Sequence, residues 1–506
     1  MIILGLLAST SISVQQQMEN MTIKQKVGQV IMAHVHAKEV NDDAKKLIDL
    51  GIGGIIYYNW ANGLDSLHQV RNLSSGLQKV AKIPLFIAID QEGGIVERLQ
   101  NGFTRWPGNR ALGETNDARL AYKAAYCIGK ELLSVGINVN FAPVVDVNSN
   151  PNNPVIGVRS FGEDPQKVAD FGLKAVEGFE RAGIIPCLKH VPGHGDTGKD
   201  SHIDLPIIYK TLEEMREVEL YPFMYIRSKM VMTAHTLIPA IDPDNCSTLS
   251  KKTLDLYRKE TGFGGVIISD SLVMEGVLKG AKNVDEVAIK AFNAGCDILL
   301  LGGSQLHGVK TVELSIEDIE QVQRSMVNAV EVGEICSERL NVAVRRILNL
   351  KSQTFNSLKT PLTSEDLKNH SLLALEIATK ALKVTVNDPS ADVSVKGKKS
   401  AIILPQFLRQ TLEGTSLSTI ENSHVVSFGE KVPEGVDVLI VCSYNAHADP
   451  IQQEQILTLI ELGKPVNLVV LRNPQDEELF AKATRVIKTF SPSKPSFDAV
   501  GNFLKG

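Results

Sequence analysis

Short apolar runs rich in β-branched residues alternate with longer segments of helical period between residues 20 and 352. Eight of these runs are predicted strands: 27–34, 53–58, 85–90, 137–142, 185–190, 230–235, 265–270 and 296–301. Helices are predicted between and after them, at 39–50, 63–81, 116–135, 165–182, 211–228, 250–260, 284–294 and 317–352. Strict alternation predicts a parallel sheet, and eight units favour a closed (β/α)₈ TIM barrel over an open doubly wound sheet.

The pattern changes after residue 352. A mostly polar stretch at 353–373 predicts a linker, and residues 374–506 return to apolar runs separated by amphipathic segments. The predicted strands of this second part are 400–404, 424–428, 437–442, 466–471 and 485–489. We therefore expect an α/β chain with a barrel domain at 20–352 and a smaller α/β sandwich domain at 374–506.

Composition argues against several kinds of partner. The net charge is −5 and there is no basic tract, so neither nucleic acid nor an acidic membrane surface is expected. No apolar run reaches the roughly 18 residues that a membrane-spanning helix needs. The six cysteines are scattered without a CxxC pair, so a disulfide framework is not expected. We expect a monomer.

The N-terminal segment at 1–19 allows two interpretations. Residues 1–8 are apolar and small residues follow, as in a signal peptide, but the basic segment that normally precedes the apolar core is missing. The segment is either a leader that sends the protein to the periplasm or outside the cell, or the frayed end of a cytoplasmic protein.

The loop at 189–202 is rich in side chains that can act as acids, bases or metal ligands. Besides lysines, its ionisable residues are His190, His194, Asp196, Asp200 and His202. In an extended segment Asp200 and His202 point the same way, so the carboxylate can orient the imidazole as a general acid and base. The alternatives are an ordinary surface pair and a metal site, and the loop has no HxH or HExxH spacing to support a metal.

Polar residues or glycines follow six of the predicted strands. They are Asp90, Asp146, Lys189 with His190, His235, Asp270 and Gly302. In a TIM barrel the active site lies at the carboxyl ends of the strands, so these residues should converge.

Three further residues are candidates by their position. Asp270 ends its strand, where a carboxylate can be a nucleophile or an electrostatic stabiliser; alternatively it caps the turn at 274–275. Arg98 and Arg159 lie in glycine-rich or turn-rich stretches. Each can donate two hydrogen bonds at once to paired hydroxyls or to a carboxylate. Either arginine alone is more often part of a surface salt bridge.

Together these motifs resemble one family. The chain is similar to the β-N-acetylglucosaminidases of glycoside hydrolase family 3, the NagZ-like enzymes, over about residues 20–350. The most specific match is the loop at 189–202, with its KHxPGHG and DSH parts. The other matching stretches are 89–94 with Arg98, 101–104, 141–146, 154–165, 232–235 and 269–274. The second domain is similar to that of two-domain members in layout only.

The resemblance implies a retaining, exo-acting glycosidase that works without metal or cofactor. It would release terminal β-linked N-acetylglucosamine from muropeptide fragments in cell-wall turnover and recycling, through a covalent glycosyl-enzyme intermediate. Asp270 would be the nucleophile, His202 the general acid/base and Asp200 its orienting partner. The residues that would hold the sugar are Asp90, Arg98, Arg159, Lys189 and His190.

Three other functions stay open. Within the same family the chain is alternatively a related β-glycosidase or a phosphorylase, although the paired Asp200 and His202 argue against an ordinary β-glucosidase. A metal-dependent hydrolase that uses the histidine loop is more remote. A catalytically inactive sugar-binding protein is the fourth hypothesis, but such a protein needs neither Asp270 nor a proton shuttle.

Overall fold

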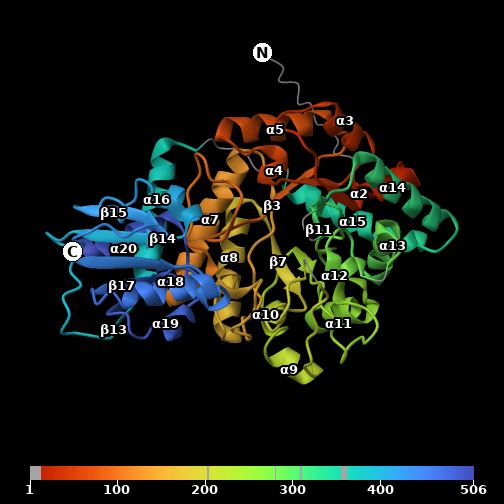
Figure 1. The fold of residues 1–506 in the computed structure, drawn as a ribbon. Helices are drawn as coiled ribbons and strands as arrows, with labels where there is room; N and C mark the ends of the chain where they lie inside the picture. Colours follow the sequence, from red (N-terminus) through yellow and green to blue (C-terminus); the bar gives the residue numbers. More distant parts are fainter. Residues whose placement is uncertain (1–12, 202–203, 280, 308–309, 355–361) are drawn as a thin grey trace, which may run out of the picture.

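The computed structural model describes residues 13–201, 204–279, 281–307, 310–354 and 362–506. The chain forms a barrel and, at its C-terminal end, a smaller part built on a separate sheet (Figure 1). In Figure 1 the blue C-terminal elements lie at one side of the barrel, the side that carries helix α7 (Ala118–Ser134).

Eight parallel strands form the barrel. They are β1 (Ile31–Ala33), β2 (Gly54–Ile56), β3 (Phe86–Ile89), β6 (Val139–Asn140), β7 (Ile185–Val191), β8 (Met230–Thr233), β9 (Val266–Ile268) and β10 (Leu299–Leu300). Their order is β10-β1-β2-β3-β6-β7-β8-β9, and a bridge between Ile268 and Ile298 joins the two ends. Every residue in these strands is buried, as expected where helices cover a parallel sheet. The predicted barrel is confirmed.

Helices surround these strands. The longer ones are α2 (Ile23–Gln29), α3 (Asp42–Asp49), α5 (Leu67–Val80), α7, α8 (Pro165–Ala182), α11 (Lys251–Thr261), α13 (Val284–Ala294), α14 (Ile316–Glu331) and α15 (Ser337–Thr354). The shorter ones are α4 (Asn59–Asn62), α6 (Asn109–Glu114), α9 (Leu212–Glu217), α10 (Tyr221–Tyr225) and α12 (Glu275–Leu278). Helix α8 shows why boundaries were predictable: Asp164 caps it, Pro165 starts it and Gly183, at φ 97°, ends it.

Apolar periodicity misplaced two boundaries. The first half of the strand predicted at 27–34 is the end of α2, which Thr22 starts through a reciprocal cap with Gln25. The helix predicted at 317–352 is two helices, α14 and α15, with Gly333 at φ 81° between them.

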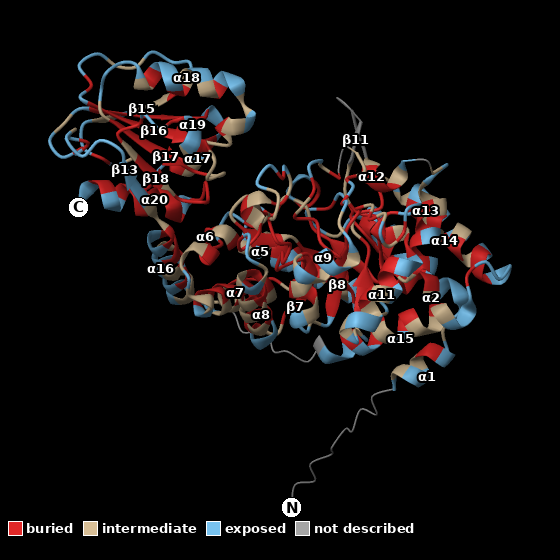
Figure 2. Cartoon of the chain, turned by 90° about the horizontal axis from the view of Figure 1, so that it is seen from below, coloured by how far each residue is buried: buried red, intermediate tan, exposed pale blue. Residues whose placement is uncertain are grey.

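The C-terminal part is a six-stranded sheet with helices on both faces, which confirms the predicted α/β sandwich. Its strands are β13 (Lys383–Val386), β14 (Ser400–Leu404), β15 (Ser423–Ser427), β16 (Val438–Ser443), β17 (Val466–Val470) and β18 (Arg485–Lys488), in the order β13-β18-β17-β16-β14-β15. The main helices are α18 (Pro450–Ile460), α19 (Asp476–Leu479) and α20 (Lys494–Lys505). Ile402 belongs to the same buried cluster as Phe497 of α20, whereas its neighbour Ile403 belongs to a second cluster with Ile456 of α18. Figure 2 shows the buried strands between more exposed helices.

Strand β13 was not predicted. It pairs antiparallel with β18 at the edge of the sheet, and three of its four residues are exposed. An edge strand that faces solvent lacks the apolar run by which buried parallel strands are recognised.

Helix α16 (Ser364–Ala381) links the two parts. It begins inside the predicted linker at 353–373, because Thr363 caps it reciprocally with Asp366. The helix packs against α6, α7 and α20, and His370 Nδ1 lies 2.7 Å from Glu131 Oε1 of α7. Much of the predicted linker is therefore helix that connects the barrel with the sandwich.

The predicted leader at 1–19 lies mostly outside the described residues. Helix α1 (Val14–Glu19) is described; it packs against α15, and its Met18 is buried. Within the described part of the chain, no helix has both the length and the apolar character to span a membrane.

Candidate active site

A cavity of about 280 Å³ opens at the carboxyl ends of the barrel strands. Six of the predicted site residues line it: Asp90, Arg98, Arg159, Lys189, His190 and Asp270. Lys189 and His190 come from the end of β7, and the other four come from loops after β3, β6 and β9, far apart in the sequence. The barrel brings these side chains together, as the position of active sites in this fold predicts.

Lys189, near the carboxyl end of β7, joins two carboxylates. Its Nζ lies 2.8 Å from Asp90 Oδ1 and 2.7 Å from Glu92 Oε1. Burial alone would lower the pKa of Lys189, but Asp90 and Glu92 raise it, so the side chain stays an ammonium. The network holds Asp90 in a fixed position at the cavity wall.

Glu92 lies in β4 (Gln91–Gly93), which forms a hairpin with β5 (Val96–Glu97) after β3. Arg159 donates from Nε and Nη2 to the two oxygens of Glu92, both at 2.9 Å. Burial would raise the pKa of Glu92, but the charges of Arg159 and Lys189 hold it at about 2. Glu92 was not predicted as a site residue; it is a permanent anion that orients two cations.

Arg98 retains donors for a ligand. Its Nη2 lies 3.9 Å from Asp90 Oδ2, and its guanidinium is 6.0 Å from the centre of the Tyr58 ring. The buried Nε of Arg98 has no hydrogen-bond partner among the described residues. A guanidinium that lines a cavity with unused donors can bind hydroxyl or carbonyl oxygens.

Asp146 orients His190. Asp146 Oδ2 is 2.7 Å from His190 Nδ1, and the backbone N–H groups of His190 and His194 donate to Oδ1 at 3.1 and 2.8 Å. Burial would raise the pKa of Asp146, but His190 lowers it, so the group is a carboxylate. The ring nitrogen Nδ1 of His190 therefore donates to Asp146, which leaves Nε2 for a ligand.

His194 belongs to the framework of the loop. Thr197 Oγ1 and Ser201 Oγ lie 2.9 and 3.1 Å from its two ring nitrogens, and burial lowers its pKa to about 4. Asn153 donates to the carbonyl of His194 at 2.8 Å. These contacts tie the loop at 193–201 to the neighbouring loop that carries Arg159.

The far end of the loop rests on helix α12. Gly276 N donates to Ser201 O at 3.1 Å, and a Cβ added to Gly276 would lie only 2.7 Å from that oxygen. Asp204 pairs with Lys279, with 2.7 Å between Asp204 Oδ1 and Lys279 Nζ. The close approach at Gly276 determines how near this arm of the loop comes to the cavity.

Asp200, one residue of the predicted proton-transfer pair, lies in the same arm. Asp200 is half-buried, and its neighbour Ser201 lines the cavity. His202 lies outside the described residues, so its contact with Asp200 stays a prediction.

Asp270 follows β9 at the cavity wall. Its N–H donates to Thr233 Oγ1 at 3.3 Å, and its Oδ1 accepts from Ser271 N at 2.7 Å. The alternative role as a helix cap is wrong, because Met274 occupies the N-cap position of α12. The carboxylate of Asp270 faces the same cavity as the Asp90 network.

His235, which follows β8, holds the backbone next to Asp270. Its Nε2 donates to Ser271 O at 2.8 Å, and Thr248 Oγ1 lies 2.8 Å from its Nδ1. His235 is fully buried, so it positions the backbone that follows Asp270.

Two aromatic residues at the cavity were not predicted. Tyr58 and Trp60 follow β2 and stack with their ring centres 5.0 Å apart. Both line the cavity, and Trp60 is 46% exposed. Their position directly after a barrel strand indicates a place in the active site, but the prediction rested on polar residues and glycines at the strand ends.

Known proteins are similar to this chain in sequence and in fold. Residues 22–350 match the model of the glycosyl hydrolase family 3 N terminal domain. The beta-hexosaminidase A of Pseudoalteromonas piscicida is 37% identical over 70% of this chain, and the match spans 62% of that protein. The beta-hexosaminidase of Neisseria meningitidis serogroup B is 36% identical over 54% of this chain and 77% of its own length.

A solved structure covers both parts of the chain. It is a glycoside hydrolase family 3 β-N-acetylglucosaminidase from Paenibacillus sp. str. FPU-7, with a TM-score of 0.86 and 34% identity. The match covers 96% of this chain and 97% of that one, so the barrel and the sandwich are shared.

Proposed function

The chain belongs to glycosyl hydrolase family 3, and we propose that it is a β-N-acetylglucosaminidase that removes the terminal, non-reducing sugar of a β-linked saccharide. Support comes from the match to the Paenibacillus β-N-acetylglucosaminidase along nearly the whole chain. The beta-hexosaminidases with 36–37% identity also support this proposed activity.

The observation that carries the proposal is the position of Asp270 in one cavity with Asp90, Arg98 and Lys189. The cavity volume of about 280 Å³ lies near the lower end for small-molecule sites and suits a single sugar ring. Charged donors and acceptors that are already held in place can bind sugar hydroxyls without further ordering. Asp90, Arg98, Arg159, Lys189 and His190 hold the terminal sugar in this proposal.

The proposed mechanism retains the anomeric configuration. Asp270 attacks the anomeric carbon, the bond to the leaving oxygen breaks, and His202 gives that oxygen a proton. The covalent glycosyl-enzyme is then cleaved by a water molecule, whose proton returns to His202. Asp200 orients the imidazole through both steps.

A histidine suits this role beside Asp270. His202 is an imidazolium before it gives its proton and a neutral imidazole afterwards, so neither form repels the carboxylate of Asp270. A second carboxylate close by would instead raise the pKa of one of the pair. Asp200, the proposed orienting partner, lies in a loop arm that rests on α12, and a shuttle carried by a loop can approach the bond after the sugar is bound.

The proposed natural substrates are muropeptide fragments that end in N-acetylglucosamine, hydrolysed by the monomeric enzyme during cell-wall turnover and recycling. The tight part of the cavity recognises the terminal sugar. The rim, where Trp60 is exposed, faces the remainder of the fragment.

The test compares the nitrophenyl β-glycosides of N-acetylglucosamine and glucose. We expect turnover of the first substrate to exceed that of the second, and Asp270→Ala to lower it by a factor of about 10⁴ or more. Asp255→Asn removes an exposed carboxylate of α11 and serves as the matched control, with activity unchanged. Near-normal activity of Asp270→Ala contradicts the assignment.

Product analysis separates the remaining alternatives. Proton NMR during the first turnovers should show the β-anomer of N-acetylglucosamine first, as retention requires. Formation of a sugar 1-phosphate when phosphate is added would identify a phosphorylase instead. Loss of activity on exhaustive chelation would favour a metal-dependent hydrolase.

A further inference from the structure

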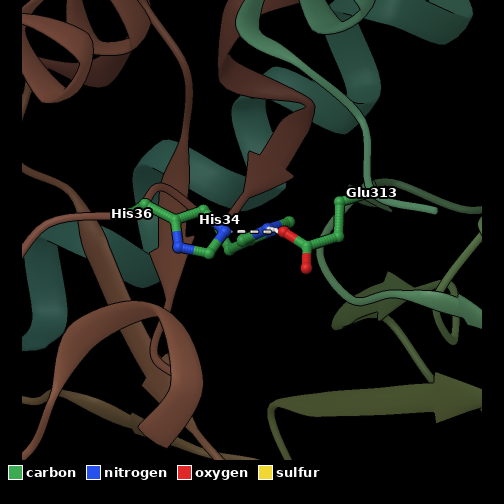
Figure 3. Close-up of side chains that lie close together, drawn as sticks. All are labelled: His34, His36 and Glu313. Carbon is green, nitrogen blue, oxygen red and sulfur yellow. Dashed lines mark hydrogen bonds and ion pairs between the residues drawn. The ribbon is translucent and has the colours of Figure 1, made fainter. Parts of the chain in front are cut away.

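A second cluster of ionisable side chains lies beside the cavity. His34 and His36 follow β1, and both face Glu313, which precedes α14 (Figure 3). His34 Nε2 lies 3.3 Å and His36 Nε2 2.6 Å from the same oxygen, Glu313 Oε2. None of the three was predicted, although the sequence has an HxH pattern here.

We propose that His34, His36 and Glu313 bind a divalent transition metal ion such as Zn²⁺. Two imidazoles and one carboxylate, with a further position for water, form a donor set that zinc commonly takes. One potential ligand atom from each residue lies within 4.8 Å of the other two. The ion would join the loop before α14 to the end of β1.

The distances fit a tetrahedral ion after a small movement. Ligand atoms at 2.0–2.1 Å from a tetrahedral zinc ion are about 3.3 Å apart, which equals the His34–Glu313 distance. The His36–Glu313 distance has to lengthen by about 0.7 Å. The His36 side chain is 60% exposed, so it can make this movement and the ion can enter from solvent.

Charge and protonation suit a cation. Burial lowers the pKa of His34, so its imidazole is neutral near pH 7. Burial would raise the pKa of Glu313, but the hydrogen bonds from the two histidines lower it, so the group is a carboxylate. The Glu313 carboxylate offsets one of the two charges of the ion.

Metal binding should affect the cavity rim through Gly303. The N–H of Gly303 donates to His34 Nδ1 at 3.3 Å, so Nε2 carries the ring proton in the metal-free state. When the ion takes Nε2, the neutral imidazole carries its proton on Nδ1, which then no longer accepts from Gly303. Gly303 lines the cavity, so occupancy of the metal site should change KM more than kcat.

The aromatic residues at the rim touch the same cluster. The Trp60 ring lies edge-on to His34, with 4.9 Å between ring centres, and 5.3 Å from the His36 ring. An ion that fixes both imidazoles therefore also limits the positions of Trp60.

The test uses full-length, untagged protein freed of metal by chelation and dialysis. Cys336→Ser is introduced into every sample, because Cys336 is the exposed thiol among the described residues. Titration calorimetry with Zn²⁺ should show one tight equivalent, and Co²⁺ should give the intense visible absorption of a tetrahedral site. His36→Ala and Glu313→Gln should each weaken binding by about 100-fold or more, since loss even of a supporting residue costs about 10–100-fold.

His424→Ala is the matched control, since it removes an exposed histidine of β15 in the sandwich. It should bind Zn²⁺ as the parent does. Circular dichroism and the thermal midpoint without metal show that the exposed His36 variant is folded. Absence of a tight equivalent in the parent, or equal affinity in His36→Ala, overturns the proposal.

Discussion

Lys189 and Glu92 form a buried ion pair, with 2.7 Å between Lys189 Nζ and Glu92 Oε1. The side chains are 3% and 2% exposed, and Arg159 holds the same carboxylate from the other side. Glu92 thus pairs with two cations that line the proposed sugar site, and Asp90 shares one of them, Lys189. Removing the charge of Glu92 would leave Arg159 without its paired carboxylate and Lys189 with Asp90 alone, in a water-poor environment.

We expect Glu92→Gln to destabilise the fold by about 3 kcal/mol or more. Removing one partner of a buried ion pair leaves the charge of the other buried without compensation. Urea denaturation followed by circular dichroism measures this change. Glu163→Gln is the control: Glu163 pairs with Arg110 at the surface, with its side chain 56% exposed. Its effect should stay below about 1 kcal/mol. Equal effects of the two changes would contradict the structural role of Glu92.

We expect Gly276→Ala to lower kcat/KM by about 10-fold or more, because small displacements of catalytic groups can cost up to about 10²-fold. The new Cβ would lie 2.7 Å from Ser201 O and 3.0 Å from Asp204 O, so the arm with Asp200 has to shift. Steady-state kinetics on the nitrophenyl substrate measures the effect.

Gly264→Ala is the matched control for this change. A Cβ at Gly264 meets no atom within 4 Å, so activity should be unaffected. If Gly276→Ala retains full activity while the control also does, the position of the arm does not matter for catalysis.

Stability should depend on pH through His370 at the contact between α16 and α7. Burial would lower the pKa of His370, but Cys127 and Glu131 raise it to about 9. The imidazolium–Glu131 contact is therefore fully stabilising below pH 6.5, the ordinary histidine pKa. Between pH 6.5 and about 9 the histidine loses its proton in the unfolded state but keeps it in the folded state. The contribution to stability therefore falls as the pH rises towards 9.

His370→Gln tests this dependence. The free energy of unfolding of the parent minus that of the variant should be on the order of 2 kcal/mol at pH 6 and should shrink towards pH 9.5. Denaturant titrations at several pH values give the difference directly. A difference that is constant with pH would show that His370 does not titrate in this way.

We expect Trp60→Ala to raise KM for an N-acetylglucosamine disaccharide by about 2–10-fold, the loss of roughly 0.5–1.5 kcal/mol of ring stacking. The nitrophenyl substrate, which extends less far from the cavity, should be affected less. Tyr209→Ala, at a position that is 82% exposed, is the control and should change neither value. Equal effects on both substrates would mean that Trp60 supports the terminal sugar site.

Much of the barrel was predictable because its signals are local. Strand β3 is a continuous apolar run and β7 begins with one, and the caps of α8 are recognised from Asp164, Pro165 and Gly183. The predicted convergence of Asp90, Lys189 and Asp270 needed only the rule that strand ends meet at one face. The edge strand β13 and the early start of α16 were missed because their signals are exposure and capping, which apolar periodicity does not contain.

The order of residues along this chain was enough to identify an alternating barrel and the residues at its strand ends, since both follow from short-range patterns of hydrophobicity and turns. The partners of those residues were decided by the folded structure. Glu92 meets Arg159, which lies 67 positions further along the chain, and His34 meets Glu313 across nearly the whole barrel. Such contacts arise because closing the sheet brings distant strand ends to one place, where burial makes each charge require a partner.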